Sequence, residues 1–196
     1  MTRTEPQLPA ADRALVAAVL ERAPGAFERL VREYQGLCWR IIYRMVRHPD
    51  DARELCQETF LRVHLRLPQF RFESALKTWI GAVAYSIALR HLERKRVPLV
   101  WLDGDEGALQ GIEEIGDEFD LESASADEQL VAAMRAEVDA LPPLPRTILM
   151  LYHLEEWPIE QIARATGMPE GSIKSHLFRG RARLRARLQL KVGVLI

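Results

Sequence analysis

The chain has 196 residues, of which 48% are hydrophobic, and its 27 Lys and Arg nearly balance 28 Asp and Glu, for a net charge of −1. That length suffices for one ordinary domain or two small ones. No apolar run reaches the roughly 18 residues of a membrane-spanning helix, and the acidic, proline-containing N-terminus lacks a signal-peptide core. The two cysteines, Cys38 and Cys56, lie in apolar helical patterns, which suits a reduced protein. We therefore expect a cytoplasmic protein.

The charges are unevenly distributed. Residues 1–96 hold 17 Lys and Arg against 11 Asp and Glu, and residues 128–196 hold 10 against 7. Between them, residues 97–127 hold 10 acids and no Lys or Arg. Blocks of like charge with several glycines seldom fold, so this segment is predicted to be a flexible acidic linker. Its apolar residues, Trp101 among them, are unusual for a pure spacer and suggest that the linker docks on another surface.

Helical periodicity dominates the chain, and no strand alternation or internal repeat is visible. We predict an all-α fold of two small helical modules, 1–96 and 128–196, joined by the linker. Asp50 or Asp51 is expected to cap the third helix, and Ser74 the fourth. The predicted helices before the C-terminal motif cover residues 11–22, 26–47, 51–67, 75–96, 126–140 and 144–154.

Residues 158–187 have the pattern of a helix-turn-helix for the DNA major groove. Gly167 can adopt the left-handed conformation that ends the first helix, and Pro169 or Ser172 begins the second. After Glu170 the second helix carries seven Lys, Arg or His and no acid. A solvated basic helix is the alternative. The predicted inner face is Ile173, Leu177, Gly180 and Leu184, and the predicted outer face is Lys174, Ser175, Phe178, Arg179, Arg181 and Arg183.

These motifs together, in this order, resemble an extracytoplasmic-function sigma factor of bacterial RNA polymerase, over about residues 26–188. The resemblance implies a sigma domain two, a linker and a sigma domain four. It also implies a DNA-binding transcription initiation factor that is not an enzyme. The segments that carry it are residues 51–60 (DARELCQETF), Phe70 with Thr78-Trp79-Ile80, the basic run 90–96, Leu141-Pro142 with Arg146, and residues 160–163, 169–175 and 178–181.

In the first module, the acidic-Leu-X-Gln-Glu core resembles the helix that binds the clamp helices of the polymerase core. Spacings of three and four residues keep these polar side chains on one helix face, opposite Leu55 and Phe60. A solvated surface is the alternative. The residues that the resemblance assigns to polymerase binding are Asp51, Arg53, Glu54, Gln57 and Glu58.

The rest of the first module resembles the region that reads the minus-ten promoter element. Basic side chains can follow the phosphate backbone, and the loop after residue 69 could hold an extruded base. Phe72 and Trp79 are expected to be core anchors. Ala82 and Ser86 stand where the family often has Arg and Asn, which affects minus-ten readout. The candidate minus-ten residues are Phe70, Arg71, Ser74, Lys77, Ser86, Arg90 and Arg94.

In the second module, Arg and Lys can read guanine edges while phosphate contacts set the register. His176 stands where the family more often has Arg, and it would carry less charge at pH 7. Arg183, Arg185 and Arg187, with Arg181, are expected to supply backbone affinity or polymerase contact. The candidate minus-thirty-five residues are Lys174, Ser175, His176, Phe178, Arg179 and Arg181.

The resemblance implies two protein partners, the polymerase core and an anti-sigma protein that occludes both modules. The resemblance also implies that the linker runs near the active-site and RNA-exit channels of the polymerase. A solvated tether is the alternative. We identify no catalytic constellation, no metal site and no cofactor motif. Two other classes stay open: a stand-alone helix-turn-helix regulator that binds duplex DNA without polymerase, and an enzyme or adaptor whose basic helix binds RNA or membrane.

Overall fold

The computed structural model describes residues 10–100 and 128–195, and the regular structure of these residues is entirely helical. The expected linker therefore lies outside the described residues from position 101 onward. The chain folds as two compact units. The first comprises Met1–Lys95 with Arg164–Gly167, and the second comprises Arg96–Ala163 with Met168–Ile196.

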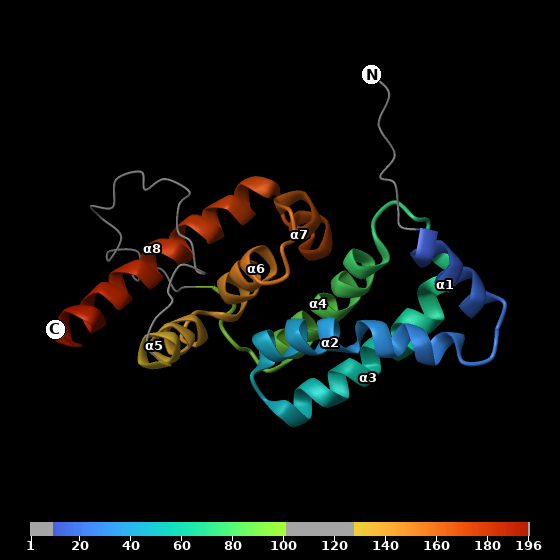
Figure 1. The fold of residues 1–196 in the computed structure, drawn as a ribbon, viewed down its shortest axis with the longest axis horizontal. Coiled ribbons are helices and arrows are strands. Elements are labelled where there is room, and N and C mark those ends of the chain that lie inside the picture. Colours follow the sequence, from blue (N-terminus) through green and yellow to red (C-terminus); the bar gives the residue numbers. More distant parts are fainter. Residues whose placement is uncertain (1–9, 101–127, 196) are drawn as a thin grey trace, which may run out of the picture. The chain divides into compact units, whose positions relative to one another are not determined.

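The first unit is built around α2, α3 and α4, which pack pairwise against one another, while α1 packs on α2 (Figure 1). Their apolar faces meet in a core in which Leu30, Ile42, Leu76 and Ile80 are fully buried, as amphipathic periodicity requires. The helices are α1 (Ala10–Leu20), α2 (Ala26–Val46), α3 (Pro49–Arg66) and α4 (Leu76–Arg94), with a short 3₁₀ turn, η1 (Leu67–Gln69), after α3.

Both expected helix caps in this unit are wrong. His48 is the N-cap of α3, and its Nδ1 accepts a hydrogen bond from the Asp51 backbone N–H at 3.4 Å. The N-cap of α4 is Ala75, whose side chain cannot cap. A carboxylate from α1 caps this helix instead, because Asp12 Oδ2 accepts from the Leu76 N–H at 3.1 Å. The cap of α3 is therefore local but lies at His48, just before Pro49 at N1, whereas the cap of α4 comes from a distant helix.

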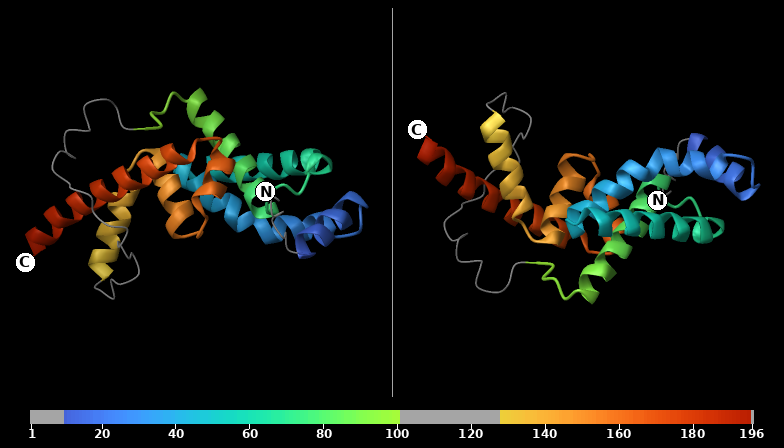
Figure 2. Two further views of the ribbon diagram at one scale, coloured as in Figure 1. Left: turned by 90° about the horizontal axis from the view of Figure 1, so that it is seen from above. Right: turned by 90° about the horizontal axis from the view of Figure 1, so that it is seen from below.

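In the second unit, the long C-terminal helix α8 packs against both α5 and α6. Both views in Figure 2 show α8 as one continuous helix, and it extends beyond the expected end near residue 187. The buried Arg146 guanidinium donates to the carbonyl oxygens of Asp139 at 2.8 Å and Leu141 at 3.2 Å, where α5 ends. The helices of the C-terminal half are α5 (Glu128–Asp139), α6 (Pro143–His153), α7 (Ile159–Thr166), whose residues from Arg164 onward are grouped with the first unit, and α8 (Glu170–Leu195).

The turn between α7 and α8 follows the sequence prediction closely. Gly167 has a φ of 73°, the left-handed conformation expected there. The Pro169 carbonyl accepts from the N–H groups of Ser172 at 3.0 Å and Ile173 at 3.2 Å, so it begins α8. The four residues of the predicted inner face are all buried: Ile173, Leu177, Gly180 and Leu184.

Candidate functional site

The outer face of α8 gathers four of the six candidate minus-thirty-five residues. Lys174, Ser175, Phe178 and Arg179 line one open hollow of about 620 Å³. Lys174 and Ser175 are exposed, and Phe178 is 47% exposed, which is unusual for so large an apolar side chain. The Ser175 hydroxyl donates to the Gly171 carbonyl at 2.9 Å and keeps its lone pairs available. The second and third turns of α8 therefore present two basic side chains, a hydroxyl group and an aromatic ring on one surface.

His176 and Arg181 do not join this surface. His176 is only 6% exposed, so its side chain belongs to the interior of the second unit. Burial, followed by the nearby Arg179 charge, lowers the pKa of His176 below its ordinary value of 6.5, so the imidazole is neutral at pH 7. Arg181 is half-buried, with its guanidinium carbon 5.4 Å from the ring centroid of Tyr152. Farther along α8, Arg187 pairs with the buried Glu137 of α5 at 3.1 Å.

In the first unit, α3 turns a polar stripe away from the core. Arg53, Glu54 and Gln57 are exposed and Glu58 is half-buried, while the helix buries its opposite face. At about 100° per residue, Glu54, Glu58, Leu61 and Leu65 fall along one line. The two leucines are 61% and 66% exposed, so the stripe continues as an apolar surface.

Asp51 differs from the other members of the expected polymerase-binding set. Its Oδ2 accepts a hydrogen bond from Lys95 Nζ at 2.7 Å and lies 3.2 Å from His91 Nε2. The Lys95 hydrogen bond is the main cause that lowers the pKa of Asp51, with the charges of Lys95, His91 and His48 adding to it against a partial desolvation. The Asp51 carboxylate is therefore engaged by side chains at the end of α4.

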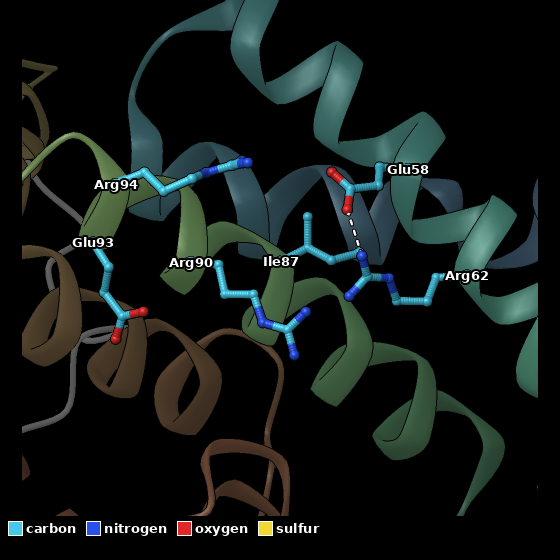
Figure 3. A pocket seen from close by; sticks show the side chains of 6 residues that line it. All are labelled: Glu58, Arg62, Ile87, Arg90, Glu93 and Arg94. Atoms are coloured by element: carbon cyan, nitrogen blue, oxygen red, sulfur yellow. Dashed lines mark hydrogen bonds and ion pairs between the residues drawn. The ribbon is translucent and has the colours of Figure 1, made fainter.

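A hollow of about 480 Å³ lies where α3 and α4 meet in the first unit. Glu58 accepts from Arg62 Nη2 at 2.8 Å on its rim, and Ile87, Arg90, Glu93 and Arg94 of α4 line the remainder (Figure 3). Arg62 is absent from the residues predicted from sequence, although its spacing of four residues from Glu58 was a usable signal. Polymerase-facing and DNA-facing candidates thus share one hollow.

The aromatic residues of the loop before α4 and of the first turn of α4 differ in burial from the expectation. Phe70 is the core anchor, at 8% exposure, whereas Phe72 and Trp79 are half-buried. Both rings stand close to Phe70, with centroids 4.8 Å and 5.1 Å away. Phe72 has a φ of 57°, a strained conformation for a bulky residue, and the Arg13 guanidinium lies 5.7 Å from its ring centroid. Phe70 therefore supports the loop from inside.

The remaining minus-ten candidates do not all share a surface. Arg90 and Arg94 are exposed in the last turns of α4, and Ser86 is half-buried on the same side, with its hydroxyl donating to Val83 O at 3.1 Å. Lys77 is exposed but lies roughly 140° around the helix from Arg90. Two candidates in the preceding loop are exposed or half-exposed, Arg71 and Ser74.

Among the described residues, no group of three or more His, Cys, Asp or Glu could hold a metal ion. None of the helices in this part of the chain is long and apolar enough to cross a membrane. Cys38 is buried and Cys56 half-buried, and both are free thiols.

Two family models match the chain. Residues 30–97 match the model described as sigma-70 region 2, and residues 131–184 match the model described as sigma-70, region 4. The first covers α3, α4 and most of α2. The second covers the helix-turn-helix and the outer surface of α8 described above.

Two relatives that match most of this chain are also sigma factors. The ECF RNA polymerase sigma factor SigW of Bacillus subtilis is 25% identical across 84% of this chain and 89% of its own length. The RNA polymerase sigma-H factor of Pseudomonas aeruginosa is 29% identical across 91% and 94%.

Two solved structures share the fold. The sigma factor RpoE of Bartonella quintana, in complex with the anti-sigma factor NepR, has a TM-score of 0.59 at 20% identity, covering 84% of this chain and 98% of that one. CnrH, in complex with the cytosolic domain of CnrY, has a TM-score of 0.63 at 17% identity, covering 92% and 98%.

Proposed function

This chain belongs to the extracytoplasmic-function sigma factors of bacterial RNA polymerase, and we propose that its two units divide promoter recognition between them. As an alternative sigma factor, it directs the polymerase core to particular promoters. In the proposal, residues 1–96 bind the core and the minus-ten element, and residues 128–196 bind the minus-thirty-five duplex. The protein itself catalyses no bond-making step and acts in the cytoplasm.

The observation that carries the assignment to duplex DNA is the shared surface on α8. Lys174 and Arg179 stand beside Ser175 and Phe178 around one open hollow, at the N-terminal end of the second helix of a helix-turn-helix. Residues in this part of a recognition helix reach base edges in the major groove. Arg and Lys can bind guanine O6 and N7, and Phe can contact a thymine methyl group. We leave His176 out of this set because it is buried, and assign Arg181 to supporting α8 through Tyr152.

For the core polymerase we propose the outer stripe of α3. Glu54, Gln57 and Glu58 supply its polar half, and the exposed Leu61 and Leu65 supply apolar area that a partner helix could bury. Large apolar side chains exposed next to each other on a helix are typical of a docking surface. Arg53 pairs with Asp50 in its own helix at 2.8 Å and is a peripheral member.

For the minus-ten element we propose Arg90 and Arg94, with Ser86 on the same side of α4, and the loop at the opposite, N-terminal end of this helix. Exposed guanidinium groups in the last turns of a helix suit phosphate contacts. Lys77 would contact DNA separately, given its different side of the helix. Phe70 acts from inside, by holding the loop in which Arg71 and Ser74 lie.

In vitro transcription with purified core polymerase tests the proposal, using a genomic promoter library. Start sites should appear only when the protein is added, and Lys174→Ala with Arg179→Ala should remove them. Arg135→Ala, which deletes an exposed charge on α5 of the same unit, is the matched control and should leave initiation unchanged. Tight duplex binding by the free protein, without initiation or co-elution with core, would instead support a stand-alone regulator.

We also propose that an anti-sigma protein holds the chain inactive, since RpoE of Bartonella quintana was solved with an anti-sigma factor bound and CnrH with the cytosolic domain of CnrY. A protein of this kind should compete with core polymerase for the α3 stripe. The test is whether a co-purifying partner is displaced by core, and whether Gln57→Ala weakens both complexes.

A further inference from the structure

The first turn of α3 and the last turn of α4 are joined by one carboxylate. Asp51, at the start of α3, accepts a hydrogen bond from Lys95 Nζ at 2.7 Å and lies 3.2 Å from His91 Nε2. These residues are 44 and 40 positions away in sequence. The Asp51 and His91 side chains are 23% and 14% exposed, so the contact is partly shielded from water. An ion pair that bridges two helices there constrains their geometry more than a fully exposed pair would.

The electrostatics of both helix ends favour this link. Asp51 lies in the first turn of α3, where the helix dipole favours negative charge, and His91 lies in the last turn of α4, where it favours positive charge. The carbonyl groups of the last turn of a helix have no onward backbone N–H donors, and this turn frays readily. The contact of Asp51 with Lys95 and His91, which we call the clasp, therefore holds the end of α4 in place.

The arginines proposed to bind the minus-ten element project from the clasped turn. His91 and Lys95 form one ridge of α4 at a spacing of four residues, and Arg90 and Arg94 form the adjacent ridge, about 100° around the helix. The hollow at the α3–α4 junction shows both arginines beside Glu58 and Arg62 (Figure 3). Because both ridges belong to one helix, holding His91 and Lys95 in place also fixes the direction in which Arg90 and Arg94 point.

We infer that Asp51 is a positioning residue for promoter binding, which clasps the end of α4 to α3 and so sets the direction in which Arg90 and Arg94 face the DNA. This inference rests on the proposed role of the two arginines, and it moves Asp51 out of the polymerase-contact set. The clasp connects α3, the proposed polymerase-binding helix, with α4, the proposed promoter-binding helix, and it sets the orientation of α4.

The test uses the full-length protein and purified core polymerase, with two measured quantities: the Kd for core, and the Kd of the holoenzyme for promoter DNA across a salt series. Asp51→Asn should leave the core Kd within about twofold and weaken promoter binding roughly tenfold, with a shallower salt dependence because phosphate contacts are lost. Asp51→Glu should recover part of the loss. Asp50→Asn is the matched control, since Asp50 pairs with Arg53 within α3, and it should change neither quantity.

A mutant cycle separates positioning from a general structural effect. In the Arg90→Ala and Arg94→Ala background, Asp51→Asn should cause no further loss of promoter affinity. Lys95→Gln breaks the same ion pair from its more exposed side and serves if Asp51→Asn fails to fold. Its effect should match that of Asp51→Asn and not add to it.

Several outcomes would overturn the inference. Weaker core binding with unchanged promoter affinity in Asp51→Asn would make Asp51 a direct polymerase contact. Additive losses from Asp51→Asn and Lys95→Gln would make Lys95 a DNA ligand and remove the clasp. If Arg90→Ala with Arg94→Ala leaves promoter affinity unchanged, the proposed minus-ten role of the arginines fails first. If that pair weakens binding but Asp51→Asn does not, only the clasp fails.

Discussion

Gly180 of α8 lies against Leu149 of α6 so closely that a Cβ on the glycine would stand 2.7 Å from Leu149 Cδ1 and 3.3 Å from its Cγ. Leu149 is itself buried, at 4% exposure, so its side chain has little room to move away. The helix that presents the proposed DNA-reading residues is thus seated on α6 at a point where a glycine allows close approach.

Gly180→Ala should therefore destabilise the second unit. Overpacking a core contact costs about 1–3 kcal/mol, and the helix propensity gained by alanine returns up to about 1 kcal/mol, so we expect a net loss of about 1 kcal/mol in chemical denaturation. Gly171→Ala is the control, because a Cβ there meets nothing within 4 Å, and it should be neutral or stabilising. A Gly180→Ala variant as stable as Gly171→Ala would mean that Leu149 repacks freely.

The burial of His176 predicts a pH dependence of stability. Its pKa is lowered in the folded chain, so between 6.5 and that lowered value the unfolded state binds a proton that the folded state does not. Stability should then fall as pH drops below 6.5, by less than about 1.4 kcal/mol per pH unit. Thermal unfolding at pH 7.5, 6.5 and 5.5 measures it, and His176→Gln should flatten the difference. Equal pH slopes in both proteins would contradict the prediction.

The two cysteines should react slowly with thiol reagents while the protein is folded. Burial raises the pKa of Cys38 to about 12, with the neighbouring Cys56 adding to it, and raises that of Cys56 to about 11. The reactive species is the thiolate, which is scarce at pH 8 for both. Alkylation followed by mass spectrometry should modify the half-buried Cys56 before Cys38, and both rapidly in denaturant. Fast modification of Cys38 in the native protein would show that the core opens locally.

Asp12 lies in a short helix, but we expect its carboxylate to make a large contribution to the free energy of unfolding of the first unit. Its buried carboxylate accepts from the Leu76 N–H and from the Tyr34 hydroxyl at 3.3 Å. Asp12→Ala leaves a helix N–H and a hydroxyl without these acceptors, and we expect a loss of about 2 kcal/mol in denaturant unfolding. Tyr34→Phe, which removes one of the two bonds, should cost less. A loss no larger than that of Tyr34→Phe would mean that water replaces the cap at Leu76.

The local pattern of the sequence was sufficient to predict the helical class, the two groups of helices and the turn before α8. Such features depend on residues a few positions apart, as in the buried series Ile173, Leu177 and Leu184 or the left-handed Gly167. Family resemblance added the assignment to sigma factors, which the region 2 and region 4 models confirm.

Tertiary structure decided the partners of individual side chains, because their contacts join positions far apart in the chain. Ser74 looked like the local cap of α4, yet Asp12 from α1, 64 positions from Leu76, caps this helix. His176 was a candidate minus-thirty-five residue, but packing buries it. Periodicity indicates which face of a helix is inward, whereas the approach of a second helix determines whether a charged side chain near the boundary faces solvent or is held in an ion pair, as Asp51 is by α4.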